Sequence, residues 1–129
     1  MAASEARNKV LAKLNAIADV EIDDKGKFKY ILIRIKDSND DSVSKCIVRG
    51  YRRADYHADI LEEVQPRIEA LGLVAVCLGG GRIDHQPGSN SIMVYGYSMG
   101  FGRADHQETV RILQANYPSY NISWSNDGY

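Results

Sequence analysis

The stretch Gly96–Gly100 (GYSMG) has the pattern G-x-S-x-G, which in many hydrolases holds a nucleophilic serine between a strand and a helix. An acid and a histidine, Asp105 and His106, follow closely. Because they are adjacent on an expected helix, their side chains would point about 100° apart and could not form a normal relay with Ser98. A short pattern with two glycines also arises by chance. We therefore expect that Ser98 is not a nucleophile, and a serine esterase is the weakest hypothesis.

The same glycine-rich turn has the composition of an anion-binding loop. Glycines let backbone N–H groups converge, and a nearby helix N-terminus adds positive potential. Residues 97–102 could then hold a phosphate with N–H donors and the Ser98 hydroxyl. From this stretch alone, an ordinary tight turn with glycines at positive φ is the simpler explanation. The second glycine cluster, Gly79–Arg82 (GGGR), is not a P-loop because it lacks the Lys-Ser/Thr ending.

Metal-ligand patterns are weak in this sequence. The three histidines, His57, His85 and His106, lack a close pairing such as H-E-x-x-H, which favours scattered polar histidines over zinc ligands. Cys46 and Cys77 fit reduced thiols in an intracellular protein, and a disulfide framework or thiolate metal site would need more cysteines. We expect neither a metal nor another cofactor.

Basic residues suggest where an anion could bind. Lys29 alternates along an expected strand with three isoleucines on the same face, which favours a position at the mouth of a cleft over a solvated edge. Arg49, Arg52 and Arg53 would ordinarily form a solvated basic face. Beside His57, however, they could attract phosphorylated protein surfaces.

The size and charge of the chain exclude several classes of protein. Its 129 residues predict one domain, too small for the sheet of a serine hydrolase with its helices. The net charge of −1 argues against a general nucleic-acid binder. No apolar run approaches the roughly 20 residues of a membrane span, and the start lacks the apolar stretch of a signal peptide. We expect a cytoplasmic protein.

Three helices are expected. Ser4 is a suitable N-cap for a helix to about Ile17, which we interpret as an appendage before the first strong strand. A second helix runs from Asp55, as its cap, to about Leu71, although Pro66 should kink it or cost a hydrogen bond. The third spans about 104–116.

Short apolar runs between the helices predict strands. The expected strands are Lys27–Lys36, Lys45–Tyr51, Leu73–Leu78, Ser91–Tyr97 and Tyr120–Trp124. The polar segment 37–44 is interpreted as a loop, the run LVAVCL as a strand buried on both faces, and the three following glycines as its end, after which Arg82–Gln86 continues extended. The predicted class is α+β, a single compact domain with a mixed sheet of five to six strands flanked by two main helices.

Six blocks of sequence resemble one known family. In chain order they are FKYILIRI, IVRGY, DYHADI, CLGGGRI followed by HQ, VYGYSM, and W.NDGY. Together they are similar to the phosphohistidine phosphatase family, also called Janus/ocnus proteins. The resemblance runs from Val20 to Tyr129, so residues 20–129 are expected to form the family domain and residues 1–19 an N-terminal helical extension. Besides this extension, the chain departs from the family at Arg53, Pro66 and Gly100, and these differences bear more on substrate preference than on chemistry.

The resemblance implies one compact α+β domain that removes phosphate from phosphohistidine in proteins and peptides without a metal. The essential histidine of the family lies in the Tyr-His-Ala-Asp block, which makes it His57 here. The phosphate-binding residues implied by the resemblance are Lys29, Ser98, Met99 and Gly100, with further basic positions at Arg49 and Arg82.

Physical chemistry is consistent with this implied role for His57. In the first turn of its helix, the macrodipole disfavours a positive ring, and Lys29 and Arg49 would act in the same direction. The expected result is a lowered pKa and a neutral imidazole at pH 7, suited to a general base or a nucleophile. Cations and N–H donors could then replace a metal in phosphoryl transfer. Without the resemblance, a surface histidine near a helix start would be the simpler interpretation.

We therefore expect a metal-independent protein-histidine phosphatase without cofactors. Its partners would be phosphohistidine-containing proteins or peptides, with no nucleic acid or membrane, and it would act as a monomer. Two questions stay open. One is whether phospholysine is a further substrate, and the other is whether His57 acts as a general base or forms a covalent intermediate. The alternative is a phosphoprotein-binding module that has the same fold but no turnover.

Overall fold

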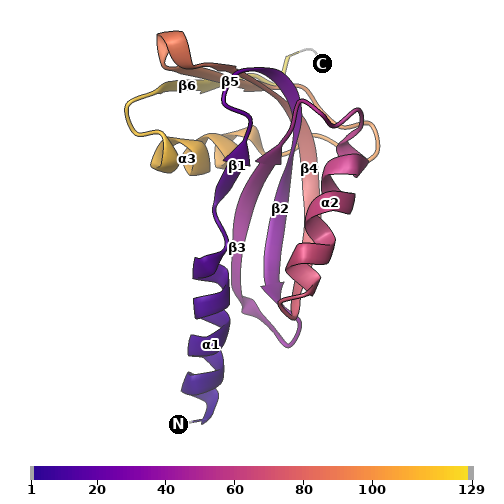
Figure 1. Ribbon diagram of the computed structural model, residues 1–129, viewed down its shortest axis with the longest axis vertical. Helices are drawn as coiled ribbons and strands as arrows, with labels where there is room; N and C mark the ends of the chain where they lie inside the picture. Colours follow the sequence, from indigo (N-terminus) through magenta and orange to yellow (C-terminus); the bar gives the residue numbers. More distant parts are fainter. Residues whose placement is uncertain (1, 128–129) are drawn as a thin grey trace.

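The computed structural model describes residues 2–127, with side chains described from Glu5 onward. Within this range, six strands form one curled mixed sheet and three α-helices pack against it (Figure 1). The elements are α1 (Ala2–Ala16), β1 (Val20–Ile22), β2 (Gly26–Asp37), β3 (Asp40–Gly50), α2 (His57–Glu69), β4 (Leu73–Gln86), a 3₁₀ turn (Pro87–Ser89), β5 (Ser91–Tyr95), α3 (His106–Asn116) and β6 (Asn121–Trp124). The predicted α+β class is confirmed.

The strand order is β1-β3-β2-β4-β5-β6, with the long strands β2, β3 and β4 in the centre. β1 pairs with β3 and β5 with β6 in parallel, whereas the remaining pairs are antiparallel. The three-residue strand β1 was not predicted, because it is too short to show a periodic pattern.

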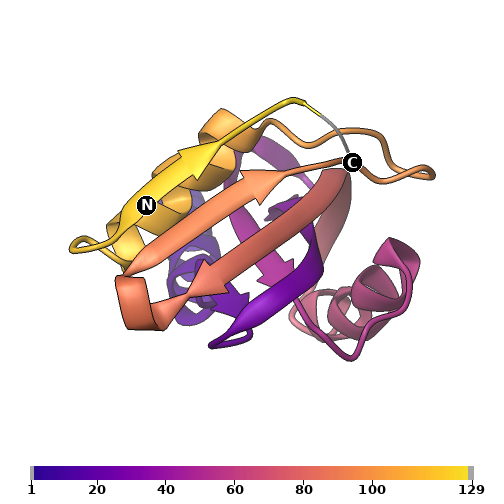
Figure 2. The ribbon, with the colours of Figure 1, turned by 90° about the horizontal axis from the view of Figure 1, so that it is seen from above.

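The two main helices cover opposite faces of the sheet (Figures 1 and 2). Ile31, Ile33 and Ile35 of β2 pack in one core with Ile60, Val64 and Ile68 of α2. Phe28, Tyr30 and Leu32, from the alternate positions of β2, pack in a second core with Ile112 and Leu113 of α3. The alternation in β2 therefore places Lys29, on the isoleucine face, on the same side of the sheet as α2.

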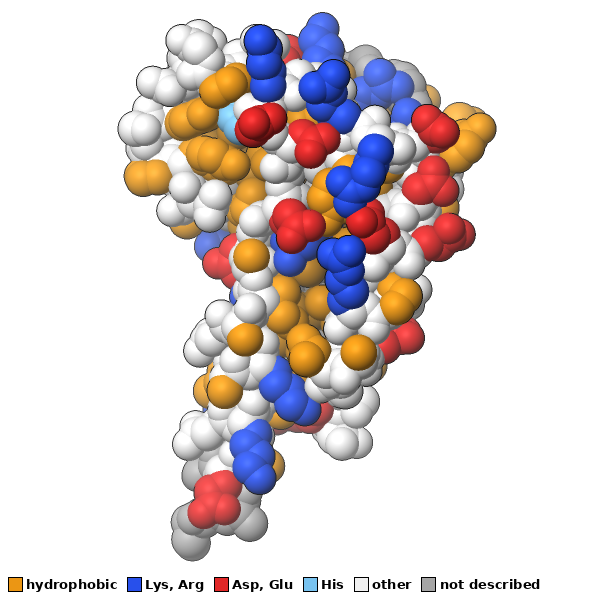
Figure 3. Space-filling model, in the orientation of Figure 1, with side chains coloured by type: hydrophobic (Ala, Val, Ile, Leu, Met, Phe, Trp, Pro, Cys, Tyr) orange, Lys and Arg blue, Asp and Glu red, His pale blue; other side chains and the backbone are white. Residues whose placement is uncertain are grey.

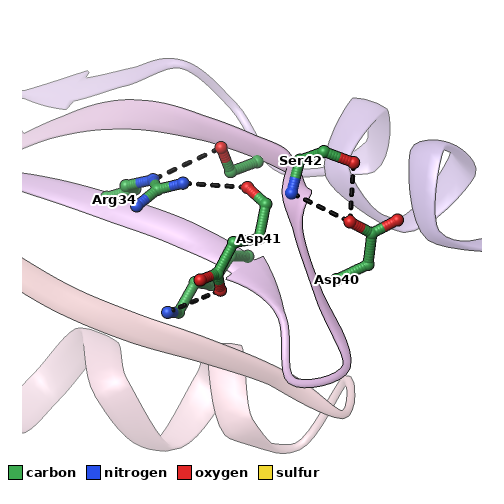
Figure 4. Close-up of polar contacts among 6 residues, drawn as sticks. Arg34, Asp40, Asp41 and Ser42 are labelled. Atoms are coloured by element: carbon green, nitrogen blue, oxygen red, sulfur yellow. Dashed lines mark hydrogen bonds and ion pairs between the residues drawn. The ribbon is translucent and has the colours of Figure 1, made fainter.

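The segment 37–44 is not a loop, which corrects the prediction. β2 and β3 form a hairpin in which only Ser38 and Asn39 lie outside the strands. Polar contacts hold its tip (Figure 4), because Arg34 donates to the backbone oxygen of Asp41 at 2.8 Å and Ser42 Oγ donates to Asp40 Oδ1 at 2.6 Å. The polar composition was misleading because side chains at an exposed hairpin tip can be hydrophilic and still belong to strands.

β4 differs from the prediction in two ways. It continues through Gly79–Gly81, and a bulge at Leu78 shifts its register with β2. Its first half is not buried on both faces, because Val76 and Leu78 are exposed. β5 pairs only with residues 82–86 of β4, so residues 73–78 of β4 have no β5 residue beside them.

The helix ends also differ in detail from the predicted ones. α1 begins at Ala2, before Ser4, so Ser4 is not its N-cap, and the side chain of Ser4 lies outside the described part. The C-terminal part of α1 is docked, since Leu14 is buried in the α2-side core. α2 begins at His57 and not at Asp55, and the Asp59 carboxylate accepts from the Tyr56 N–H at 2.9 Å. No helix in the described range is long and apolar enough to cross a membrane.

Candidate functional site

His57 occupies the first position of α2, and its side chain packs against β4. The residue is only 7% exposed, and Nε2 lies 2.9 Å from the backbone oxygen of Gly81. A carbonyl oxygen can only accept a hydrogen bond, so Nε2 carries the proton. In the neutral ring Nδ1 then has a lone pair, and no group in the described part of the chain bonds to it. The ring lines a cleft. Nε2 is held by the Gly81 carbonyl, while Nδ1 remains able to accept a proton.

Glycines in β4 make room for this histidine. A Cβ atom on Gly80 would lie 2.7 Å from His57 Cδ2 and 3.2 Å from Ser98 Cβ. The absence of a side chain at residue 80 therefore lets the imidazole and Ser98 lie close together against the strand. Gly79 has φ of 151°, and a Cβ there would come within 2.7 Å of the Ala104 nitrogen. These glycines were predicted to end a strand. They instead continue β4 and let His57 and Ser98 lie close against it.

The pKa of His57 is lowered, as the sequence predicted, but the causes differ from the expected ones. Burial of the ring is the largest cause, and the charges of Lys29 and Arg82 act in the same direction. The hydrogen bond to Gly81 opposes them without reversing the shift. Arg82 therefore takes the part that we had expected of Arg49. The ring is neutral at pH 7, so Nδ1 is able to accept a proton.

The turn after β5 holds Ser98 in a closed backbone loop. Ser98 N–H donates to the Gly102 carbonyl at 3.1 Å, and Gly102 N–H donates back to the Ser98 carbonyl at 2.8 Å. Ser98 Oγ accepts from the Phe101 N–H at 3.1 Å, which leaves the hydroxyl proton able to donate. No acceptor within residues 2–127 bonds to the N–H groups of Met99 or Gly100. The turn therefore offers hydrogen-bond donors, as an anion site requires.

The acid and histidine that follow this turn have other partners. Asp105 caps α3 by accepting from the N–H groups of Gln107 and Glu108 at 3.1 and 3.3 Å. His106 donates from Nε2 to the Gly96 carbonyl at 2.7 Å and accepts at Nδ1 from the Tyr30 hydroxyl at 2.6 Å. Both side chains are engaged away from Ser98, so the G-x-S-x-G pattern has no relay behind it.

Five of the predicted site residues meet in one cleft of about 540 Å³. These are Lys29, His57, Ser98, Met99 and Gly100. Phe101 belongs to the segment 97–102 that was expected to hold a phosphate, whereas Asp55, Tyr56 and Ala58 also line the cleft and were not predicted as site residues. Nothing in their types marked them, because loop and rim residues become neighbours only through the fold. A methyl group on Gly100 would contact nothing, so the cleft has room for a side chain at this position.

The other predicted residues lie outside this cleft. Arg82 pairs with Lys29 in the register of β4 with β2, and both line an adjoining hollow. Arg49 is buried and is not among the residues that line the cleft. Its guanidinium donates to the carbonyls of Val48 and Ala18 at 2.9 and 2.8 Å, so it ties β3 to the segment before β1. The cleft therefore draws its positive charge from Lys29 and the neighbouring Arg82.

Basic side chains crowd the end of the molecule where β2 and α2 begin, mixed with some acidic ones (Figures 1 and 3). In residues 2–127, no group of three or more His, Cys, Asp or Glu side chains is placed to hold a metal ion. Positive charge at this end would thus come from Lys and Arg side chains. Such an arrangement can bind and polarise a phosphoryl group directly.

Known proteins share this sequence closely. Residues 14–121 match the Janus/Ocnus family (Ocnus). The chain is 48% identical over 122 residues to the 14 kDa phosphohistidine phosphatase of Sus scrofa, covering 92% of this chain and 97% of that protein. It is 46% identical over 123 residues to the protein of the same name from Homo sapiens, covering 92% and 98%. It is also 49% identical over 113 residues to the sex-regulated protein janus-A of Drosophila pseudoobscura pseudoobscura, covering 85% and 76%.

Proposed function

The chain belongs to the Janus/Ocnus family, and on this premise we propose that it is a protein-histidine phosphatase. Its extensive identity with two proteins named 14 kDa phosphohistidine phosphatase supports a hydrolase that acts on phosphohistidine in proteins or peptides. The proposal further holds that it acts without a metal, as a cytoplasmic monomer. The observation that carries the residue assignment is the cleft-lining imidazole of His57, with Nε2 fixed by Gly81 and Nδ1 available.

In the proposed reaction, the phosphoryl group lies between Lys29 and the turn of Ser98–Gly100. Lys29 and the turn N–H groups stabilise the phosphoryl oxygens, and the Ser98 hydroxyl donates a further hydrogen bond. A water molecule beside Nδ1 of His57 attacks phosphorus from the side opposite the substrate nitrogen, and Nδ1 takes its proton. A P–O bond forms as the P–N bond breaks, and the substrate imidazole, protonated beforehand on its other ring nitrogen, leaves as neutral imidazole with the P–N electron pair.

Two alternatives compete with this mechanism. His57 could instead take the phosphoryl group on Nδ1, which would require a second base for hydrolysis of the intermediate. His85 and His106 do not line the cleft, and their ring nitrogens bond to other groups, which favours the general base. The other alternative is a binding module that holds phosphohistidine without turnover. Retention of a neutral, cleft-lining His57 beside Lys29 argues against it.

The test is phosphate release from a phosphohistidine peptide in excess EDTA, with wild type and His57→Ala compared. We expect turnover by the wild type, unchanged by EDTA, and loss in the variant. Loss of wild-type activity on chelation, with recovery on adding a divalent ion, would remove the metal-free mechanism. Tight binding without turnover by the wild type would establish the binding module instead. A phospholysine peptide in parallel would define the substrate range.

A further inference from the structure

A second, basic hollow opens beside the cleft of His57. It has a volume of about 260 Å³ and is lined by four cationic side chains, those of Lys27, Lys29, Arg52 and Arg82. The acidic side chain of its lining is Asp55. Lys29 and Asp55 also line the cleft, so the two cavities are neighbours with a common wall. The proposed reaction uses Lys29 and leaves Lys27 and Arg52 without a part.

Three strands bring these cations together. Lys27 and Lys29 are two residues apart on β2 and therefore lie on one face of the sheet. Arg82 is opposite Lys29 on β4. Arg52 follows the end of β3, and its side chain lies over the start of β2, with Cδ 3.5 Å from where a Cβ on Gly26 would stand. The fold thus concentrates positive charge at one end of the sheet.

The charge at this end is only partly compensated. In the described residues, no ion pair involves Lys27, Lys29 or Arg52, whereas Arg53 pairs with Glu63. Two further carboxylates are near the hollow but have other hydrogen-bond partners. Asp84 lies opposite Lys27 and accepts from the Gln86 amide at 2.6 Å, and Asp23 accepts from the Arg52 backbone N–H at 2.6 Å. Lys27 and Arg52 therefore have capacity for an anionic ligand.

We propose that this basic hollow binds a carboxylate side chain of the substrate, an Asp or Glu close in sequence to the phosphohistidine. The inference rests on the proposed function, because it needs a phosphohistidine segment in the neighbouring cleft. The hollow is large enough for a carboxylate but adjoins the cleft at Lys29, so both anions must belong to one short segment. The net charge of −1 gives no support for nucleic acid as the source of the anion.

The cleft has other lining residues that do not line the hollow and that carry no positive charge. Met99 is 88% and Tyr56 is 70% exposed, and Phe101 lines the same cleft. None of these three side chains is a cation, so they attract a carboxylate less strongly than Lys27 and Arg52 do. An acidic residue is therefore expected to be favoured on one side of the phosphohistidine and not on the other.

The test uses matched phosphohistidine peptides with Glu or Gln at one position, scanned from three residues before to three residues after the phosphohistidine. Wild type should show a kcat/KM about 5- to 30-fold higher for Glu than for Gln at positions on one side, a preference that weakens as salt is raised. In Lys27→Ala/Arg52→Ala the Glu-to-Gln ratio should fall to about one. Lys36→Ala, which removes a cation near the other end of β2, should keep the wild-type ratio. Free phosphohistidine should be hydrolysed equally by all three proteins.

The outcomes separate the hollow from the proposed function. Equal turnover of Glu and Gln peptides by wild type would overturn the carboxylate site while leaving the phosphatase intact. A loss of activity toward free phosphohistidine in Lys27→Ala/Arg52→Ala would also overturn it, since the cations would then serve the phosphoryl group. If no substrate turns over, the proposed function fails. Binding affinities of the same peptides for His57→Ala still test the hollow, and Glu must bind more tightly than Gln.

Discussion

Two histidines, His57 and His106, occupy equivalent places in this fold and have different uses. Each is the first residue of a helix, each is buried, and each donates its Nε2–H to a backbone oxygen, of Gly81 and Gly96 respectively. The pKa of each is lowered, with burial as the largest cause in both cases. Type, burial, tautomer and pKa direction therefore do not distinguish them.

The difference lies in the second ring nitrogen. Nδ1 of His106 accepts from the Tyr30 hydroxyl, which also lies 3.0 Å from Thr109 Oγ1, in the core beneath α3. Nδ1 of His57 faces no such partner within residues 2–127, and its ring lines the cleft. A buried histidine with both nitrogens bonded stabilises the fold, whereas one with a spare nitrogen in a cleft is able to do chemistry.

Replacing each histidine by alanine should give opposite results. His57→Ala should lower kcat/KM by about 10²- to 10⁴-fold, the range for loss of a general base, with a smaller loss of stability than His106→Ala because its ring faces the cleft and bonds to the fold through Nε2 alone. His106→Ala should lower the free energy of unfolding by about 2–4 kcal/mol, because it leaves a cavity and removes the bonds of the ring to Tyr30 and to the Gly96 carbonyl. Phosphate release measures the loss of activity in both variants, and urea denaturation measures their loss of stability. A stable His106→Ala protein without activity would contradict it.

Lys29 marks a further difference between the two histidines, because it adds a positive charge to the cleft of His57. A histidine with a structural role, such as His106, does not require such a charge. Lys29→Ala should lower kcat/KM by about 10- to 150-fold, the equivalent of one charged hydrogen bond of roughly 1.5–3 kcal/mol. Lys29→Arg should retain much more activity, since the positive charge is the required property. Near-wild-type kinetics of both variants would place Lys29 outside the site.

Ser98 should contribute less than a nucleophile would. If its hydroxyl donates one hydrogen bond to phosphate, Ser98→Ala should cost roughly 1–3 kcal/mol, or about 5- to 150-fold in kcat/KM. Steady-state kinetics of this variant and of Ser98→Thr, which retains a hydroxyl, give the measurement. Complete inactivation, or a phosphoryl group trapped on Ser98, would restore the nucleophile hypothesis.

The lowered pKa values of His57 and His106 also predict how activity and stability depend on pH. Because the pKa of His57 is lowered, activity should hold below the ordinary histidine value of about 6.5 and fall only as pH drops through the folded-state pKa. In that window the unfolded chain binds more protons than the native state, so stability also falls as pH decreases. His106→Ala should flatten the stability profile without moving the acid limb of kcat/KM. An acid limb above 6.5 would contradict the lowered pKa.

Local patterns in the sequence were enough to predict much of this molecule. Alternation in β2 predicted that three isoleucines share one face, and they pack together in one core. The resemblance grouped His57, Lys29 and the Ser98 turn, which all line one cleft. Contacts between distant segments were not predictable in this way. Gly80 and Gly81 seat His57 and His106 on opposite faces of β4, where a Cβ on Gly81 would lie 2.6 Å from His106 Cε1. From the sequence alone, Gly80 and Gly81 indicated only the end of a strand.

The sequence also failed to predict the strand segments at the exposed edges and tips of the sheet. Polar residues of the hairpin at 37–44 gave no apolar period, and the short strand β1 gave too few residues for one. Arg49 was assigned to the cleft by resemblance, but its bonds to two backbone carbonyls depend on the placement of the segment before β1. Such roles become visible only when the partners of each side chain are known.

The most direct test of a general base at His57 is the stereochemistry at phosphorus. A chiral thiophosphorylated histidine peptide, hydrolysed in ¹⁸O-water, should give inversion, because one in-line attack by water replaces the nitrogen. Intact-mass analysis after rapid alkaline quench should show no phosphoryl adduct on His57 during turnover. Net retention of configuration, or an adduct that forms and decays at the turnover rate, would establish two displacements and contradict the general-base mechanism.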